Sequence, residues 1–446
     1  MIDKITQSVS HLAELYVDQK DERPWAIAWS GGKDSTTVLS LVLKMLEALP
    51  ADKRTRQIHV VMSDTRVENP EVGAYMHSQV EAFNQYVKPR NLPIEAQVVY
   101  RQVEQSYFVL TLGRGYFLPM RNGGGRWCTQ RLKITPQDNA LKAIDPSYII
   151  IGTRLSESAS RAASIRKWSI SERVGEHVSL PNTHTFMPIV DWTIDDVWAY
   201  LSQGSLGWTT TSEVRRIYKE ATGECGVNNP RGVENIAAKA EACGARFGCW
   251  LCPVVANDRS TEEMTKYHAW LEPLTHYREL QAKVYGDFKP IKPEGQSRAH
   301  RSADLRKWEA INEQIRLITK CGHNRAGKRM KDGQGTFTVE ARRYLFEELM
   351  ATQKLVNRLR QYEGLPAMSL IDGEEVVLIK KLWANDEANT PHVVTNALGR
   401  SINDLPDLVD GKISDKLVAE YVERREKSKK AASERLLLKD NDITAK

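Results

Sequence analysis

Residues 25–37 read Trp25-Ala-Ile-Ala-Trp-Ser-Gly-Gly-Lys-Asp-Ser-Thr-Thr37. In this stretch an apolar run ends in a glycine turn, and a helical pattern begins directly after the turn. Apolar residues continue at helical spacing after this stretch, with Val38, Val42 and Met45 on one stripe. A strand, a glycine turn and a helix in this order present backbone N–H groups to an anion. The helix N-terminus adds roughly half a positive charge, and Lys33 adds a full one. The stretch therefore predicts a phosphate-binding loop in an α/β fold.

This loop differs from the Walker A loop, because Ile27 fills a position where that loop needs glycine. It resembles the Ser-Gly-Gly-x-Asp-Ser signature of the ATP pyrophosphatase (PP-loop) family. That resemblance implies cleavage of ATP between its α and β phosphates and adenylation of a substrate. It also implies catalytic roles for Lys33, Asp34 and Ser35, and ATP contacts from Ser30, Gly31, Gly32, Lys33, Ser35 and Thr36. The alternative is an ordinary turn between a strand and a helix.

Length, charge and hydropathy limit the remaining possibilities. A chain of 446 residues suggests two or three domains, and a net charge of +6 permits a nucleic-acid partner without requiring one. We find no apolar run of the ~18 residues that a membrane helix needs. Residues 1–20 also lack an apolar core followed by a cleavage site. We therefore expect a cytoplasmic protein with no membrane partner.

Strand-like and helical patterns alternate along the first half of the chain. Residues 57–63 and 94–100 have the pattern of buried strands, and a helix is expected from Pro70 to about Lys88. Such alternation predicts a doubly wound, mostly parallel sheet with helices on both faces. Asp64 and Thr65 follow the second strand, where such a sheet contacts a ribose or a metal.

The predicted fold is thus α/β, of the adenine nucleotide alpha hydrolase-like (PP-loop) type, with a cysteine-rich insertion and a helical C-terminal region. We divide the chain into an N-terminal helix (1–24), a PP-loop ATP pyrophosphatase domain (25–215), a cysteine-rich iron–sulfur and basic region (216–335) and a helical region (336–446).

The alternating pattern breaks between residues 107 and 136, a stretch rich in glycine, arginine and aromatic residues. A solvated surface loop is one interpretation. The other is a lid or channel wall for a polyanion, because guanidinium groups and aromatic faces suit phosphates and bases. On the second interpretation the nucleic-acid contacts come from Arg114, Arg121, Arg126, Arg131 and Lys133.

Two further segments are similar to the sulfonucleotide reductases, the phosphoadenylyl- and adenylyl-sulfate reductases. Cys128-Thr-Gln-Arg-Leu-Lys133 resembles their Cys-Cys-x-x-Arg-Lys segment, with a single cysteine and the lysine displaced by one position. The stretch from residue 148 to residue 161 resembles their Gly-x-Arg…Ser…Arg element, which implies ATP contacts from Gly152, Arg154 and Arg161. Thr193 and Asp196 have the spacing of a capping box at a helix start.

Cysteines are concentrated in one later segment, where Cys249 and Cys252 form a Cys-x-x-Cys pair six residues after Cys243. In a long cytosolic enzyme such a cluster favours metal or redox chemistry over disulfides. A structural zinc site needs four protein ligands with no open position, typically from two such pairs. An iron–sulfur cluster tolerates irregular spacing and a distant ligand. The reductase resemblance supplies that distant ligand, so we expect a [4Fe–4S] cluster on Cys128, Cys243, Cys249 and Cys252.

Cys225 lies in a Glu-Cys-Gly triplet that resembles the catalytic Glu-Cys-Gly of the reductases. We place it with the catalytic residues, and a role as a persulfide carrier is one of three interpretations. A fourth cluster ligand and a buried thiol are the alternatives.

Read together, several segments resemble the DNA phosphorothioation sulfurtransferases of the Dnd system, the DndC family: Gly113-Arg-Gly-Tyr116, Glu224-Cys225, Arg246-Phe-Gly-Cys-Trp250-x-Cys252 and Gly335-Thr-Phe-Thr-Val-Glu-Ala-Arg342-Arg343. This resemblance implies a DNA substrate, ATP, Mg²⁺ and an iron–sulfur cluster. It also implies a cysteine desulfurase as sulfur donor and other phosphorothioation-system proteins as partners. A phosphoadenylyl-sulfate reductase, a tRNA-thiolating enzyme and a nucleotide-gated DNA-binding module remain alternatives.

Overall fold

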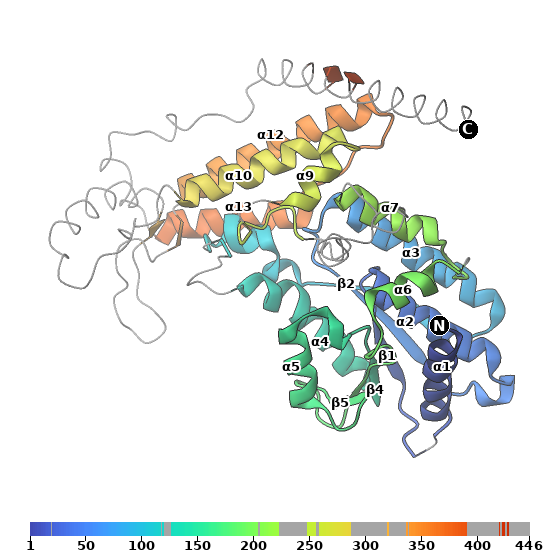
Figure 1. Cartoon of the computed structure of the whole chain (residues 1–446). Helices are drawn as coiled ribbons and strands as arrows, with labels where there is room; N and C mark the ends of the chain where they lie inside the picture. The colour runs from blue at the N-terminus through green and yellow to red at the C-terminus, as the bar shows by residue number, and fades with distance from the viewer. Residues whose placement is uncertain are drawn as a thin grey trace, which may run out of the picture. The chain divides into compact units, whose positions relative to one another are not determined.

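The computed structural model describes residues 1–18, 20–116, 118–119, 126–203, 206–222, 248–255, 258–286, 319–320, 336–337, 339–389, 419, 422–423 and 426–427. The chain divides into two compact units, and both are shown in Figure 1. The first unit combines Met1–Gln102 with Cys128–Phe247, and the second combines Val103–Trp127 with Gly248–Lys446. The described residues between 103 and 127 therefore belong to the second unit.

A six-stranded sheet forms the centre of the first unit. Its strands are β1 (Trp25–Ala28), β2 (Ile58–Asp64), β3 (Ile94–Tyr100), β4 (Tyr148–Ile150), β5 (Val174–Glu176) and β6 (His184–Phe186). Their spatial order is β3-β2-β1-β4-β6-β5. All neighbours run parallel except β5, which pairs antiparallel with β6. The predicted mostly parallel sheet is confirmed.

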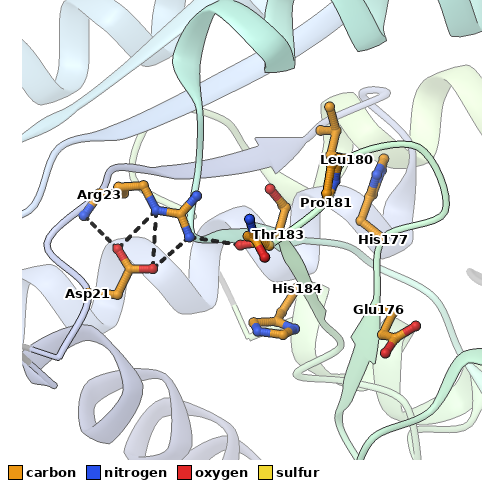
Figure 2. Close-up of a pocket in the computed structure, with 9 residues that line it drawn as sticks. Asp21, Arg23, Glu176, His177, Leu180, Pro181, Thr183 and His184 are labelled. Atoms are coloured by element: carbon orange, nitrogen blue, oxygen red, sulfur yellow. Dashed lines mark hydrogen bonds and ion pairs between the residues drawn. The ribbon is translucent and has the colours of Figure 1, made fainter.

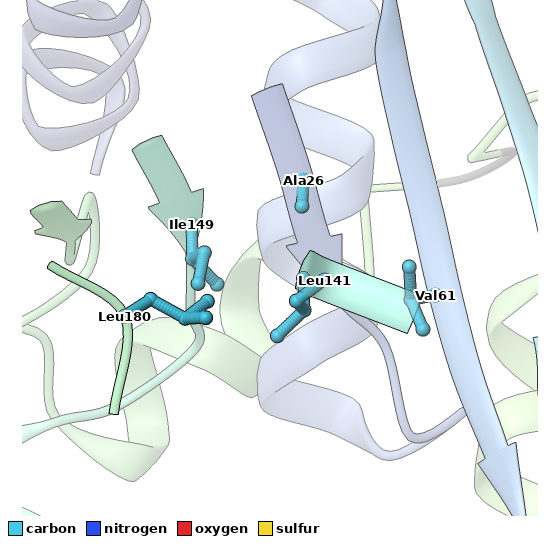
Figure 3. Packing of buried hydrophobic residues seen from close by; sticks show 5 residues of the cluster. All are labelled: Ala26, Val61, Leu141, Ile149 and Leu180. Carbon is cyan, nitrogen blue, oxygen red and sulfur yellow. The ribbon is translucent and has the colours of Figure 1, made fainter. Parts of the chain in front are cut away.

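Seven α-helices of the first unit surround this sheet within its described residues. They are α1 (Ile2–Val17), α2 (Lys33–Ala48), α3 (Pro70–Val87), α4 (Thr135–Ile144), α5 (Ala159–Trp168), α6 (Ile194–Leu201) and α7 (Thr211–Thr222). Leu141 of α4 packs on one face of the sheet against Ala26, Val61 and Ile149 (Figure 3). Side chains alternate along a strand, so Trp25 points to the other face, where its ring meets Tyr16 of α1 at 5.3 Å. Helices thus cover both faces.

Two helix starts follow the local chemistry of their sequences. The side chain of Asn69 accepts a hydrogen bond from the Glu71 N–H, and Pro70 occupies the first helical position of α3. Thr193 and Asp196 form the predicted capping box of α6. Both expected helix starts are confirmed.

The second unit is helical in its described residues, apart from a short antiparallel pair, β7 (Thr319–Lys320) and β8 (Thr336–Phe337). Its α-helices are α9 (Arg259–Thr265), α10 (Glu272–Gly286), α12 (Val339–Tyr362) and α13 (Gly373–Asn389). The Tyr277 hydroxyl of α10 donates to the Leu345 carbonyl of α12 at 3.0 Å. The expected C-terminal helical region is therefore confirmed through residue 389. Among the described residues, no helix is long and apolar enough to cross a membrane.

The strand order fixes where a ligand site is expected. From β1 the chain proceeds to β2 and β3 on one side, whereas β4 and β6 lie on the other. The connections after β1 and after β4 therefore leave the same edge of the sheet in opposite directions. Ligands of open α/β sheets bind at such a switch point, and the Ser30–Ser35 loop follows β1 there.

Candidate functional site

The loop after β1 is held in shape by its own serines. Gly31 has φ +70°, a left-handed conformation that glycine adopts without strain. The Ser35 hydroxyl donates to the Gly32 carbonyl at 3.1 Å and accepts from the Ser30 N–H at 3.2 Å. The hydroxyls of Ser30 and Ser35 lie 3.1 Å apart. Ser35, in the first turn of α2, therefore closes the loop with its side chain.

The connection after β4 packs directly against this loop. A Cβ atom at Gly152 would lie 2.8 Å from the Asp34 carbonyl carbon and 2.9 Å from the Ser35 nitrogen. Two residues later, Arg154 is 3% exposed and its Nε donates to Asp34 Oδ1 at 2.6 Å. The structure thus joins the two switch-point connections that the sequence predicted to share a ligand.

Lys33 completes a buried charge cluster at the start of α2. It is only 7% exposed, and its Nζ lies 3.1 Å from Asp34 Oδ2. Asp34 is thus shared between Lys33 and Arg154, so the three side chains carry one net positive charge. Together with the helix N-terminus, this surplus favours an anion at the loop.

Two buried tyrosines bracket the loop, and sequence reasoning missed both. The Lys33 backbone N–H donates to the Tyr218 hydroxyl at 3.1 Å, and Lys33 Nζ lies 5.3 Å from the centre of that ring. Tyr75 donates to the Gly31 carbonyl at 3.4 Å. Burial raises the pKa of both phenols, so each stays protonated at neutral pH. The sequence indicates Tyr218 only weakly, as a tyrosine on the buried stripe of a helix far along the chain.

Asp64, at the carboxyl end of β2, belongs to a second polar group. Its Oδ2 lies 2.8 Å from His77 Nε2, and its Oδ1 accepts from the Arg66 N–H at 2.6 Å. The guanidinium of Arg66 lies 4.4 Å from the centre of the Tyr100 ring, and the His77 ring stacks near the same tyrosine. Thr65 donates its N–H to the Glu68 carboxylate at 3.0 Å. The predicted acid at this edge is thus present with a basic and an aromatic neighbour.

Burial raises the pKa of Glu68 above its ordinary 4.5, and the nearby Asp64 charge adds to that effect. A raised acid pKa means that the folded protein disfavours the ionised carboxylate, so its stability falls as pH rises from about 4.5 through the folded pKa. We expect Glu68→Gln to remove this penalty. The free energy of unfolding of the variant, relative to the parent, should therefore increase between pH 4.5 and pH 8. Urea denaturation at both pH values measures the difference, and a pH-independent difference would contradict the inference.

Two other residues predicted to contact ATP, Thr36 and Arg161, make different contacts in the structure. The Thr36 hydroxyl accepts from the Trp29 indole N–H at 3.2 Å, which fixes the first turn of α2. Arg161 lies on α5 with an exposed side chain and pairs with Glu157 at 3.2 Å. A nucleotide contact from Arg161 stays a prediction.

The predicted nucleic-acid residues are divided between the two units. Arg114 and Arg126 are exposed and belong to the second unit. Arg131 and Lys133 lie in a π-helical turn of the first unit, η5 (Thr129–Ile134). Arg121 lies outside the described residues. π-Helical turns occur often at functional sites, so the geometry is compatible with this prediction without testing it.

The cysteine pair forms a single turn in the second unit. The Cys252 N–H donates to the Cys249 carbonyl at 3.0 Å. The buried guanidinium of Arg278 donates to the Cys252 carbonyl at 2.8 Å and also to the Val255 carbonyl. Cys249, Cys252 and Cys128 are half-buried thiols, and Cys128 belongs to the first unit. Cys225 and Cys243 lie outside the described residues.

This turn suits a pair of metal ligands, because a short Cys-x-x-Cys turn can offer two thiolates to one group. The described residues contain no cluster of three or more His, Cys, Asp or Glu side chains placed to bind a metal. The four-cysteine ligand set therefore stays a prediction.

Comparison with known proteins bears on the unit that carries the loop. Residues 24–210 match the model of the phosphoadenosine phosphosulfate reductase domain. The matched region holds the Ser30–Ser35 loop, Asp64, Gly152 and Arg154. An uncharacterized protein of Methanocaldococcus jannaschii is 26% identical over 188 residues, which are 41% of this chain and 32% of that protein. The chain thus spans about a third of that relative's length.

Solved structures with similar folds include three nucleotide- or sulfur-related proteins. Phosphoadenylyl-sulfate reductase from Candida auris is 13% identical, with 44% of this chain and 84% of that one covered and a TM-score of 0.28. The U34-tRNA thiolase NcsA from Methanococcus maripaludis, solved with its [4Fe–4S] cluster, is 12% identical, with coverage of 67% and 84% and a TM-score of 0.29. Candida glabrata FMN adenylyltransferase is 13% identical, with coverage of 50% and 61% and a TM-score of 0.31.

A separate cavity of about 520 Å³ occurs in the first unit, among residues that precede β1 and β6 (Figure 2). Arg23 lies in its wall, paired with Asp21 at 2.7 Å and donating to the Asn182 carbonyl. His177 and His184 also line it, and burial lowers the pKa of His177. Because parallel strands share one direction, the amino ends of β1 and β6 lie at the edge opposite the loop. None of the predicted site residues lines this cavity.

Proposed function

We propose that this protein is an ATP pyrophosphatase that forms AMP and pyrophosphate and uses the activated intermediate to put sulfur into a DNA backbone phosphate. One observation carries the proposal: the Ser-Gly-Gly loop and Lys33 meet Gly152 and Arg154 at the switch point of the sheet. This is an anion-binding arrangement inside the region that matches a phosphosulfate reductase domain. The resemblance of the loop to the ATP pyrophosphatases assigns the anion to ATP.

The chemistry follows from the poor leaving ability of a phosphodiester oxygen. A non-bridging oxygen of the DNA phosphate attacks the α-phosphorus of ATP, and the bond to the β-phosphate oxygen breaks, so pyrophosphate leaves. Sulfur at the oxidation level of hydrosulfide then attacks the adenylated DNA phosphorus and AMP leaves with the original oxygen. Lys33 and the loop N–H groups stabilise negative charge that develops on the α-phosphate and on pyrophosphate. Mg²⁺ bound with ATP would neutralise part of the phosphate charge.

Asp34 positions the two cations in this scheme. It pairs with Lys33 and with Arg154 at the same time, so it holds both against the loop. Ser35 closes the turn behind them. The nucleotide therefore meets a preformed set of donors, and little reorganisation is needed when charge develops.

The sulfur chemistry is assigned to the cysteines. Cys249 and Cys252 would hold a [4Fe–4S] cluster together with Cys128 and Cys243. Cys225 would carry sulfur as a persulfide, and a thiol reductant would supply the two electrons that release its outer sulfur as hydrosulfide and restore the Cys225 thiol. A bound cluster supplies electrons or a binding place for sulfide. Anaerobic purification followed by iron and sulfide analysis should find about four of each per chain, and Cys249→Ser should lower both. Stoichiometric zinc without iron would overturn the assignment.

DNA is the proposed acceptor, with phosphate contacts from Arg114, Arg121, Arg126, Arg131 and Lys133. A cysteine desulfurase is the proposed sulfur donor, and other phosphorothioation-system proteins are the proposed partners. Mass spectrometry of nuclease-resistant dinucleotides, from DNA of cells with and without the gene, tests the whole proposal. We expect phosphorothioate dinucleotides only where the gene is present. Equal amounts in both samples would contradict a DNA acceptor and direct attention to thiolated tRNA.

A further inference from the structure

An aromatic stack in the second unit reaches the protein surface. The Trp127 ring stacks on Tyr107, with centroids 5.9 Å apart and planes at 22°. The Tyr116 ring meets Trp127 edge-on at 5.9 Å and 79°. Tyr107 is buried, whereas Trp127 and Tyr116 are only half-buried. Trp127 is therefore the more exposed ring of a stack whose base, Tyr107, is buried.

Contacts from α10 and from the cysteine turn fix that base. The Tyr107 hydroxyl donates to Gln281 Oε1 at 3.3 Å. The neighbouring Phe108 ring lies 6.4 Å from Trp250, which is 2% exposed and stands between Cys249 and Cys252 in the sequence. The stack thus runs from the surface to the turn that carries the cysteine pair.

Helices α12 and α13 hold the backbone at Leu112 and Gly113. The fully buried Arg342 donates to the Gly113 carbonyl and to Asp386 Oδ2, the latter at 2.6 Å. The Trp383 indole N–H donates to the Leu112 carbonyl at 2.7 Å. Arg114 follows at once with an exposed side chain. The C-terminal helices therefore present Arg114 and Tyr116 from a fixed backbone.

We propose that Trp127 and Tyr116 form a stacking platform for an unpaired base of a polynucleotide, with Arg114 and Arg126 contacting the flanking phosphates. A base offers its face to a side chain only when it is unstacked, as in single strands. A planar aromatic group with a buried backing ring, and exposed arginines close to it in the sequence, meets both needs of such a ligand. The platform would place the strand beside the Cys249–Cys252 turn. This inference rests on the proposal that the acceptor is a nucleic acid.

The test compares a fluorescent single-stranded DNA oligonucleotide with an abasic oligonucleotide of the same length, without ATP. Stacking contributes ~1–3 kcal/mol per base, so Trp127→Ala should weaken binding of the base-containing strand by about 5- to 150-fold. Binding of the abasic strand should change less than about twofold. Trp127→Phe should retain most of the difference between the strands and controls for folding. Trp168→Ala is the matched control, because Trp168 is also half-buried and lies beside the basic Lys167, but on α5.

Arg114→Gln separates charge from stacking. It should weaken both oligonucleotides equally and reduce the slope of log K against log salt by about 0.7 for a single strand. If Trp127→Ala loses the same affinity for both strands, or loses none, the platform is overturned. Either result would leave the proposed ATP cleavage untouched. Failure of the parent protein to bind either strand would overturn the nucleic-acid acceptor as well.

Discussion

Replacing Lys33 by alanine is expected to slow the formation of AMP and pyrophosphate by about 10²- to 10³-fold. This is the usual cost of removing one preorganised group that stabilises transition-state charge. Lys33 supplies the positive charge that remains after Asp34 has neutralised one of two cations. Without it, Asp34 and Arg154 cancel, and only the helix N-terminus and the loop N–H groups face the nucleotide.

Lys44→Ala is the matched control for this substitution. Lys44 lies on the same helix, α2, with an exposed side chain whose Nζ is 5.5 Å from the centre of the Tyr200 ring. The Lys44→Ala variant loses the same charge, but at a distance from the loop. Its rate of pyrophosphate release should therefore stay within about twofold of the parent, because exposed charges are screened. Steady-state release of pyrophosphate measures both variants. Equal rates for Lys33→Ala and the parent would remove Lys33 from the site.

Gly152→Ala is expected to disable the same site by steric means. The added Cβ would lie 2.8 Å from the carbonyl carbon and oxygen of Asp34 and 2.9 Å from the Ser35 nitrogen. Because these are backbone atoms, the loop must shift. Overpacking of this kind costs about 1–3 kcal/mol of stability. A displacement near 1 Å in a positioning element costs about 10² in rate.

A second glycine provides the contrast. Gly73 lies inside α3, and its added Cβ would meet no atom within 4 Å. Gly73→Ala should leave the rate unchanged and stabilise the fold by about 0.5–1 kcal/mol, because alanine loses less conformational freedom in a helix. Thermal unfolding and pyrophosphate release, measured on both variants, separate the two effects. A fully active Gly152→Ala variant would show that the close packing of the connection after β4 against the loop has no part in activity.

The fold was predictable because its signals are local. The run from Trp25 to Thr37 specifies a strand, a glycine turn and an amphipathic helix within a few residues of one another. Pro70 and the pair Thr193 and Asp196 mark helix starts by chemistry that acts over one turn. Alternation of such elements is enough to predict a mostly parallel sheet, and the structure confirms it.

The partners of the site were harder to predict because they come from distant positions. Tyr218 reaches the loop from α7, and nothing near it in the sequence distinguishes it from an ordinary core tyrosine. The contact between Arg342 and Gly113 also joins two segments that lie more than 200 residues apart in the sequence. Both segments were noted as resemblance motifs, but no local rule states that they touch.

The identity of the products formed from ATP tests the account most directly. The purified protein, supplied with DNA, hydrosulfide, Mg²⁺ and ATP labelled in the α-phosphate, should release the label as AMP together with an equal amount of pyrophosphate. The reaction should require Lys33 and should proceed with the Lys44→Ala control. Release of labelled ADP with inorganic phosphate would contradict the assignment of the Ser30–Ser35 loop as a site that cleaves ATP between its α and β phosphates.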